Sequence, residues 1–166
     1  MILETLEDVA LKYGVGRMRI LVAGDHGAFT LKAQVVEYLQ QRGHDVVDLG
    51  THGPESVDYP EFAGQLCRAL LSGAGDRGVL MCGTGIGISM AANRFPGIRA
   101  ALCHDELTAR LSRLHNDANV LVMGGRTTGP AVADAILAAW LKTPFEGGRH
   151  SRRLEILEQQ YTKETP

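Results

Sequence analysis

The apolar residues of this chain fall into two kinds of segment that alternate along the sequence. Short uninterrupted runs such as Arg19–Ala23, closed by Gly24, are typical of strands covered on both faces. Longer stretches such as Phe29–Arg42 repeat apolar residues every three or four positions, which predicts amphipathic helices. The predicted strands are Arg19–Ala23, Asp45–Leu49, Gly78–Cys82, Ile98–Leu102 and Asn119–Met123. The predicted helices are Phe29–Arg42, Glu61–Ser72, one ending near Asn93, Asp105 to about Leu114, Ala131–Leu141 and about Ser151–Gln160.

The regular alternation of strands and helices predicts an α/β fold. Right-handed strand–helix–strand units build a parallel sheet with helices on both faces. We therefore expect a three-layer, doubly wound, Rossmann-like domain with a five-stranded parallel sheet of order 2-1-3-4-5. This single domain should span residues 18–166. Residues 1–17 form an N-terminal extension that is either a packed helix or a frayed segment.

Composition excludes several classes of function. The chain has 166 residues, a formal net charge of −2, an isoelectric point near 6.3 and 5% aromatic residues, which argues against a nucleic-acid binder. Its 3 cysteines lack a C-x-x-C pair, so neither a disulfide framework nor a zinc ribbon is expected. No metal-ligand spacing stands out. An acidic N-terminus and the lack of an apolar run of ~18 residues argue against secretion and membrane insertion, so we expect a cytoplasmic protein.

Candidate chemistry lies in two loops of the predicted sheet. Ligands of open parallel sheets bind beyond the carboxyl ends of the strands, where strand order reverses. With the expected order, that point lies between the first and third strands. The loops there are Gly24-Asp25-His26-Gly27 and Cys82-Gly83-Thr84-Gly85-Ile86-Gly87. An acid, a histidine, a cysteine and several glycines should therefore meet in one crevice.

The glycine-rich loop has several readings. Its exposed N–H groups at a helix start suit a phosphate or an oxyanion that develops during a reaction. A dinucleotide-binding loop needs G-x-G-x-x-G, and the third glycine is replaced by Ile88, which weakens that reading without excluding it. No G-K-S/T follows, so a P-loop is excluded. A tight turn without a ligand is the remaining alternative.

The individual candidate residues, in these loops and elsewhere, also have purely structural explanations. Cys82 either packs in the core or acts as a thiolate whose pKa is lowered by the following helix N-terminus. Asp25 and His26 could simply cap a helix, and His115 at a helix end could simply complement its dipole. Arg149 and Arg153 lie one helical turn apart, which suits a phosphate monoester as well as it suits a solvated basic face. Arg126 follows the fifth strand on the ligand side.

Taken together, these residues resemble the family of ribose-5-phosphate isomerase B and galactose-6-phosphate isomerase. The resemblance covers about residues 18–160 and is closest to the ribose-5-phosphate isomerase B branch. The segments that carry it are Ala23-Gly-Asp-His-Gly27, Val57-Asp-Tyr-Pro60, Met81-Cys-Gly-Thr-Gly-Ile-Gly-Ile-Ser89, Ala91-Ala-Asn93, Gly97-Ile-Arg-Ala100, Leu114-His-Asn-Asp117, Gly124-Gly-Arg126 and Glu146-Gly-Gly-Arg-His150.

The resemblance implies an aldose–ketose isomerase that interconverts ribose 5-phosphate and ribulose 5-phosphate without metal or cofactor. It makes Cys82 the base that moves a proton through a cis-enediol(ate), since relatives without this cysteine carry a glutamate where Ile88 stands here. It makes His115 the residue that opens the sugar ring, and it implies a homodimer or dimer of dimers whose sites use both subunits. The implied substrate-binding residues are Asp25, His26, Gly83, Thr84, Gly85, Ile86, Gly87, Asn116, Arg126, Arg149 and Arg153, with Tyr59 lining the pocket.

Two other functions stay open at this stage. An isomerase of a tetrose or hexose phosphate would use the same chemistry, because pocket length is not readable from the sequence. A non-catalytic Rossmann-type nucleotide-binding module is the other alternative.

Overall fold

A computed structural model describes residues 16–162 and contains a five-stranded parallel sheet. The predicted strands are all present, with ends shifted by a residue or two. The largest change is at the fourth, which loses Ile98 and Arg99 because the hydrogen-bonded ladder begins only at Ala100. The strands are β1 (Arg19–Gly24), β2 (Asp45–Asp48), β3 (Arg77–Cys82), β4 (Ala100–Leu102) and β5 (Val120–Gly124).

The predicted helices are present as well. The last helix differs most, because it runs from Arg149 to Thr162 instead of from about Ser151 to Gln160. The helix α3 begins at Tyr59 instead of Glu61, because Pro60 is accepted in a first helical turn. Asp105 is the N-cap of α5 and accepts a hydrogen bond from the Thr108 N–H at 2.7 Å. The helical elements are η1 (His26–Ala28), α2 (Phe29–Gln41), α3 (Tyr59–Leu71), α4 (Ile86–Ala92), α5 (Glu106–Asn116), α6 (Pro130–Lys142) and α7 (Arg149–Thr162).

The expected α/β class is confirmed, but the expected order of the last two strands is wrong. The sheet runs β2-β1-β3-β5-β4, so β5 lies inside and β4 at the edge. Burial explains the exchange. All five residues of β5 are buried, whereas the three residues of β4 are only half-buried, as befits a short edge strand. The reversal of strand order between β1 and β3 is unaffected by this correction.

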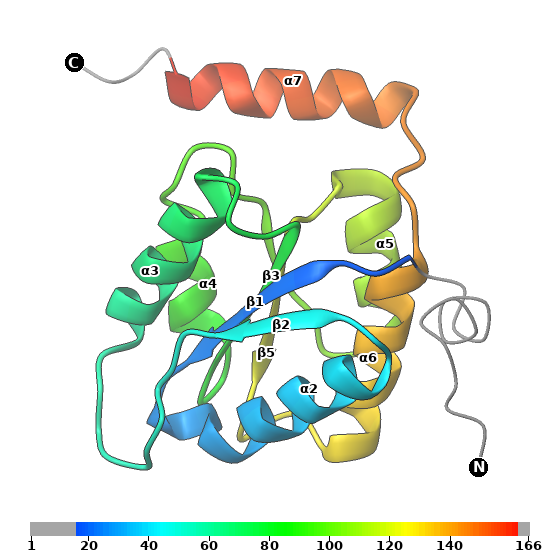
Figure 1. The fold of residues 1–166 in the computed structure, drawn as a ribbon. Coiled ribbons are helices and arrows are strands. Elements are labelled where there is room, and N and C mark those ends of the chain that lie inside the picture. Colours follow the sequence, from blue (N-terminus) through cyan, green and yellow to red (C-terminus); the bar gives the residue numbers. More distant parts are fainter. Residues whose placement is uncertain (1–15, 163–166) are drawn as a thin grey trace, which may run out of the picture.

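Helices cover both faces of the sheet (Figure 1). On one face, α2, α5 and α6 bury a core that includes Val35, Leu121 and Trp140. On the other face, α3 and α4 bury a second core that includes Leu66, Leu80 and Ile88. The connections that run toward the β2 side of the sheet contain α2 and α5, and both helices lie on the first face. The connections that run toward the β4 side contain α3 and α4, and both lie on the second face. All four connections are therefore right-handed.

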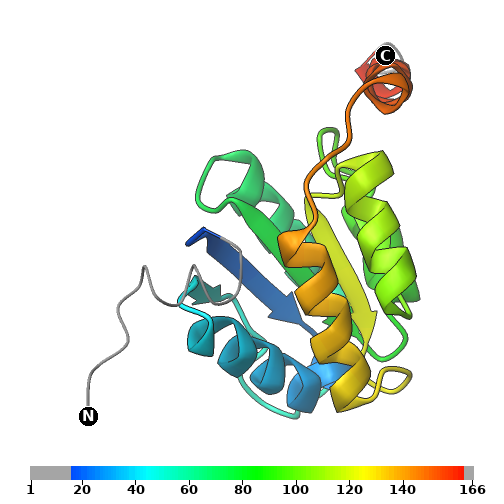
Figure 2. The same ribbon diagram turned by 90° about the vertical axis from the view of Figure 1, so that its right-hand side faces the viewer.

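The last helix, α7, stands away from this body. Figure 2 shows the strands pointing away from α7, so α7 lies beyond the edge of the sheet where the strands begin. We call this the N-terminal edge, and the opposite one, where the strands end, the C-terminal edge. Within residues 16–162, no helix is long and apolar enough to cross a membrane. Residues 1–15, most of the expected extension, lie outside the described residues.

Candidate active site

Three loops meet at the C-terminal edge of the sheet. The sequence predicts two of them, after β1 and β3, and the loop after β5 joins them because β5 instead of β4 lies beside β3. The Asp25 N–H donates to the Met81 carbonyl at 3.1 Å, which joins the loop after β1 to β3. The Gly125 N–H donates to the Cys82 carbonyl and the Arg126 N–H to the Gly83 carbonyl, both at 2.8 Å. The loops after β1, β3 and β5 are therefore fixed to one another around Cys82.

The Cys82 thiol is held inside the glycine-rich loop. Its residue is 4% exposed, and the Gly85 N–H donates to its Sγ at 3.2 Å. Gly85 makes this possible with φ +78°, a conformation that side-chain-bearing residues rarely adopt. This hydrogen bond fixes the position of the sulfur beside the backbone of the loop.

Tyr59 covers the same loop from the start of α3. A Cβ added at Gly87 would lie 2.6 Å from the Tyr59 Cζ, so the phenol ring rests directly on this glycine. Tyr59 itself is 36% exposed. The pocket-lining role that the resemblance implies for Tyr59 stays a prediction.

The polar residues predicted around Cys82 are present at this edge. The Asp25 carboxylate accepts the Gly27 N–H at 2.9 Å, and this residue is buried. The His26 Nδ1 accepts the Val57 N–H at 3.2 Å, so its Nε2 carries the proton in the neutral ring and is a donor. The exposed Arg126 lies with its Nη1 3.1 Å from the position that a Cβ on Gly83 would take. Thr84 is exposed in the loop, and its Oγ1 accepts the Ile86 N–H at 3.3 Å.

The other two cysteines differ from Cys82. Burial raises the pKa of Cys67 to about 11 and that of Cys103 to about 11. Both residues are almost fully inaccessible, and both thiols are therefore protonated at neutral pH. This agrees with their interpretation as core residues.

The remaining predicted residues lie at the opposite edge. His115 and Asn116 end α5, which starts after β4 at the C-terminal edge and runs back for 11 residues, about 16 Å of helix. Arg149 and Arg153 begin α7, beyond the N-terminal edge. A cavity of about 310 Å³ lies between α7 and this edge and is lined by Asn116, Arg99, Leu154 and Leu157 among others. One chain therefore does not bring His115 to Cys82.

His150 and Glu146, for which no role is predicted, lie next to His115. The rings of His115 and His150 are stacked, with centroids 4.3 Å apart and planes 11° apart. The Glu146 Oε2 lies 3.8 Å from the His115 Nε2 and 3.9 Å from the His150 Nε2. Burial, reinforced by His115, lowers the pKa of His150. The i, i+4 spacing of Glu146 and His150 was the available signal, but it does not reveal the proximity to His115, which is distant in sequence.

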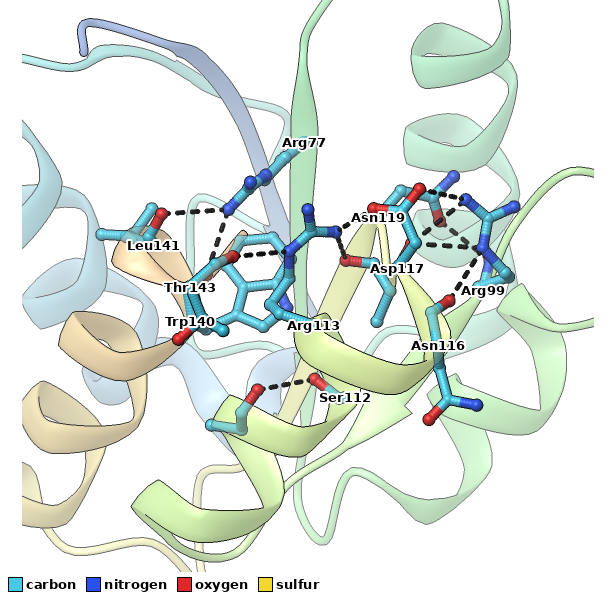
Figure 3. Close-up of polar contacts among 12 residues, drawn as sticks. Arg77, Arg99, Ser112, Arg113, Asn116, Asp117, Asn119, Trp140, Leu141 and Thr143 are labelled. Atoms are coloured by element: carbon cyan, nitrogen blue, oxygen red, sulfur yellow. Dashed lines mark hydrogen bonds and ion pairs between the residues drawn. The ribbon is translucent and has the colours of Figure 1, made fainter. Parts of the chain in front are cut away.

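A network of arginines fixes the end of α5 (Figure 3). Asp117 caps the helix with φ 44° and binds the buried Arg113 at 2.8 Å and Arg99 at 3.3 Å. The Arg99 Nε also donates to the Asn116 carbonyl at 3.1 Å, and its Nη1 binds Glu158 of α7 at 2.9 Å. The last turn of α5, which carries His115, is thereby tied to both the sheet and α7.

The comparisons with known proteins agree with this architecture. Residues 20–157 match the family model described as Ribose/Galactose Isomerase. The chain is 48% identical over 139 residues to Escherichia coli ribose-5-phosphate isomerase B, covering 84% of this chain and 93% of that protein. It is 41% identical over 140 residues to the D-erythrulose-4-phosphate isomerase of Pectobacterium atrosepticum, covering 83% and 91%.

A solved structure gives the same result in three dimensions. The structure of Clostridium thermocellum ribose-5-phosphate isomerase B superimposes with a TM-score of 0.87 at 49% identity, covering 88% of this chain and 99% of that one. Sequence and fold therefore agree over nearly the whole described region. This chain belongs to the ribose/galactose isomerase family and is an isomerase.

Proposed function

We propose that this protein interconverts D-ribose 5-phosphate and D-ribulose 5-phosphate through a cis-enediol(ate). The observation that carries the proposal is the Cys82 thiol held by the Gly85 N–H in the loop where three strand ends meet. Moving a proton between C1 and C2 requires a base that is active near neutral pH, and a hydrogen-bonded thiolate meets that need. Cys82 takes the proton from one carbon and returns it to the next.

The surrounding donors stabilise the charge that develops on oxygen. The loop from Gly83 to Gly87, with the Thr84 hydroxyl, stabilises the enediolate. Within it the Gly85 N–H donates to the Cys82 Sγ and the Ile86 N–H to the Thr84 Oγ1, so the other N–H groups of the loop take this role. Their fixed orientation avoids the cost of reorganising water. The Asp25 carboxylate and the Asn116 amide hold sugar hydroxyls. The Asp25 assignment rests on the geometry of the loops together with its motif. The Asn116 assignment rests on its motif, and because Asn116 lies at the opposite edge with His115, it comes from the second copy of the chain.

The complete site requires a second copy of the chain. Cys82 and His115 lie at opposite edges of one chain, so a partner supplies His115 for ring opening. Exposed apolar residues support this pairing. Ile86 and Met90, beside the Cys82 loop, are 49% and 64% exposed, while Ile156 and Leu157 of α7 are 46% and 38% exposed. A two-fold dimer that buries α7 of each chain against α4 of the other covers both surfaces at once.

The phosphate end of the substrate is held by positive groups from both edges. His26 and Arg126 lie on the Cys82 side, and Arg149 and Arg153 begin α7 on the other. Arginine pairs bind phosphate through several charge-assisted hydrogen bonds. This distant binding positions the reacting carbons over Cys82.

Sugar preference is tested by measuring isomerisation of four-, five- and six-carbon aldose and ketose phosphates in the presence of EDTA. The five-carbon pair should give the highest kcat/KM, and EDTA should not lower it. The 41% identity to a D-erythrulose-4-phosphate isomerase makes a tetrose phosphate the second candidate. Preference for a tetrose phosphate would show that the substrate differs from the proposed one, whereas the type of reaction would stay the same.

The shared site is tested by mixing two inactive variants, Cys82→Ala and His115→Ala. After subunit exchange, the mixed dimer has one site with both Cys82 and His115 intact. Random pairing of equal amounts makes half of the dimers mixed, so the mixture should regain about a quarter of wild-type activity. A site built within one chain would regain none. Molar mass by light scattering distinguishes a dimer from a dimer of dimers.

We further propose that this reaction takes place in the cytoplasm and belongs to the pentose phosphate pathway. The three cysteines are free thiols, as expected in a reducing compartment.

A further inference from the structure

His115 at the end of α5 and His150 at the start of α7 form a cluster with Glu146. One ligand atom from each of His115, Glu146 and His150 lies within 4.8 Å of the other two. Both Nε2 atoms approach the same carboxylate oxygen, at 3.8 and 3.9 Å. The sequence alone gives no such arrangement, because α5 and the loop before α7 are far apart along the chain.

The backbone holds these residues in place. The Glu146 N–H donates to the Leu114 carbonyl at 3.0 Å, which fixes the loop to the last turn of α5, next to His115. The His150 N–H donates to the Gly147 carbonyl at 3.1 Å and completes the turn that carries the second ring. His150 is 3% exposed, so its ring has little freedom to move away. Glu146 has a side chain that is 54% exposed and can shift toward both rings.

The donor set is that of a transition-metal site. Two imidazoles and one carboxylate, with a fourth position open to water, are the ligands of many zinc centres. Zinc bonds of about 2.0–2.1 Å place tetrahedral ligands about 3.3 Å apart, so the two Nε2–Oε2 distances need to shorten by about half an ångström. Because the two rings are stacked with planes 11° apart, the His115 ring, whose side chain is 36% exposed, must also turn before both Nε2 lone pairs point at one ion. The ion would in addition displace the Arg149 Nε–H, which donates to the His150 Nε2 at 3.4 Å. Magnesium and calcium prefer an all-oxygen shell and are poorly served by two imidazoles.

We propose that His115, Glu146 and His150 form a binding site for zinc or a similar borderline divalent ion, and that the bound ion blocks ring opening. The second part rests on the proposed function, in which His115 opens the sugar ring. A metal ion on the imidazole nitrogen takes up the lone pair that this proton transfer needs. The ion is therefore an inhibitor that competes with ring opening, and the isomerisation itself does not use it.

Binding is tested on the full-length protein after chelator treatment, by calorimetric titration with Zn²⁺ and no sugar present. Wild type should bind one ion per chain, and Co²⁺ in the same site should give the intense visible absorption of a four-coordinate centre. Glu146→Gln and His150→Gln should each weaken Zn²⁺ binding at least about tenfold, because each removes a ligand. Glu146→Gln changes an exposed side chain and so also answers the question if His150→Gln fails to fold.

Two control variants test whether Zn²⁺ binds at a different site. His104→Gln removes an exposed histidine outside the cluster and should bind Zn²⁺ like wild type. Cys82→Ser removes the other attractive zinc ligand and should also bind normally. Loss of binding in Cys82→Ser, or unchanged binding in Glu146→Gln and His150→Gln, overturns the proposed site. None of these measurements depends on which sugar the enzyme uses.

Inhibition is tested separately with the sugar phosphate that the activity assay selects. The Zn²⁺ concentration that halves activity should rise at least about tenfold in Glu146→Gln, with each variant compared to its own metal-free rate. His104→Gln should keep the wild-type sensitivity. An unchanged sensitivity in Glu146→Gln shows that inhibition arises elsewhere and overturns the link to ring opening, whereas lack of activity on every sugar phosphate contradicts the proposed function instead.

Discussion

The backbone N–H of Gly85 donates to the Sγ of Cys82 at 3.2 Å, from within the same loop. This contact joins the candidate base to the loop that we propose stabilises the developing negative charge. It exists because the chain turns back after β3 with Gly85 in the left-handed region, at φ +78°. In the proposed mechanism, one short segment therefore supplies both the base and the groups that stabilise charge.

Replacing the thiol tests the base directly. Cys82→Ala should lower kcat by at least ~10²-fold, since this is the usual contribution of a general base. Cys82→Ser keeps a side chain of nearly the same shape and should also be severely impaired, because a hydroxyl is far less acidic than a thiol. Steady-state kinetics and a circular dichroism spectrum for each variant suffice. Near-normal turnover in Cys82→Ala removes Cys82 from this role.

The turn at Gly85 should be intolerant of a side chain. In Gly85→Ala the new Cβ would lie 3.0 Å from the Met123 carbonyl carbon and 3.1 Å from its oxygen, neither of which can easily move, and 2.5 Å from the Leu102 Cδ1, in addition to the strain of a positive φ. Gly73 has φ +82° with nothing within 4 Å of its Cβ position, so Gly73→Ala is a control for the strain alone. Gly85→Ala should lose about 1–3 kcal/mol more free energy of unfolding than Gly73→Ala in urea titrations. Equal losses would show that the loop accommodates the methyl group.

Alkylation should distinguish the three cysteines. With their pKa values raised to about 11, Cys67 and Cys103 remain protonated at pH 8 and should not react with iodoacetamide. Inactivation should therefore coincide with labelling of the peptide that contains Cys82, read by mass spectrometry. A sugar phosphate that fills the site should slow both. Labelling of Cys67 before Cys82 contradicts this order of reactivity.

The arginines at the start of α7 should act on binding. Arg149→Ala should raise KM at least about tenfold, the effect of losing one charge-assisted contact with a phosphate, and should change kcat little. Arg152 is exposed on the same helix and has no assigned role, so Arg152→Ala is the matched control and should keep the wild-type KM. Equal changes of KM in the two variants would show that Arg149 contributes only to the general positive charge of this surface and makes no specific contact with the phosphate.

The charge of Asp117 should matter more than its shape. Asp117→Asn keeps a residue that tolerates φ 44° but leaves the buried Arg113 without its carboxylate. The expected loss is about 1–3 kcal/mol in free energy of unfolding, below the range for a fully buried pair because the Asp117 side chain is 36% exposed. Asp45→Asn breaks an exposed pair with Arg19 and should cost at most about 1 kcal/mol. Asp117→Asn should also lower kcat/KM, because the last turn of α5 loosens around His115.

The strand and helix pattern and the reversal of strand order at Cys82 could be predicted from the sequence. Apolar runs and glycine positions are local features, and the convergence of Cys82 with Asp25 and His26 follows once β1 and β3 are neighbours. The order of β4 and β5 could not be predicted, because both are apolar. What decides it is the amount of surface each strand buries, and that depends on the packed sheet.

The placement of His115 was decided only by the tertiary structure. Its motif indicates a role in catalysis, but the direction of α5 carries it to the edge of the sheet opposite Cys82. The contact between His115 and His150 likewise depends on the path of the loop before α7. The sequence alone determined which residue types the chemistry has available. The folded chain determined which of them share one side of the molecule, because burial and the direction of each crossover act over distances that local sequence does not encode.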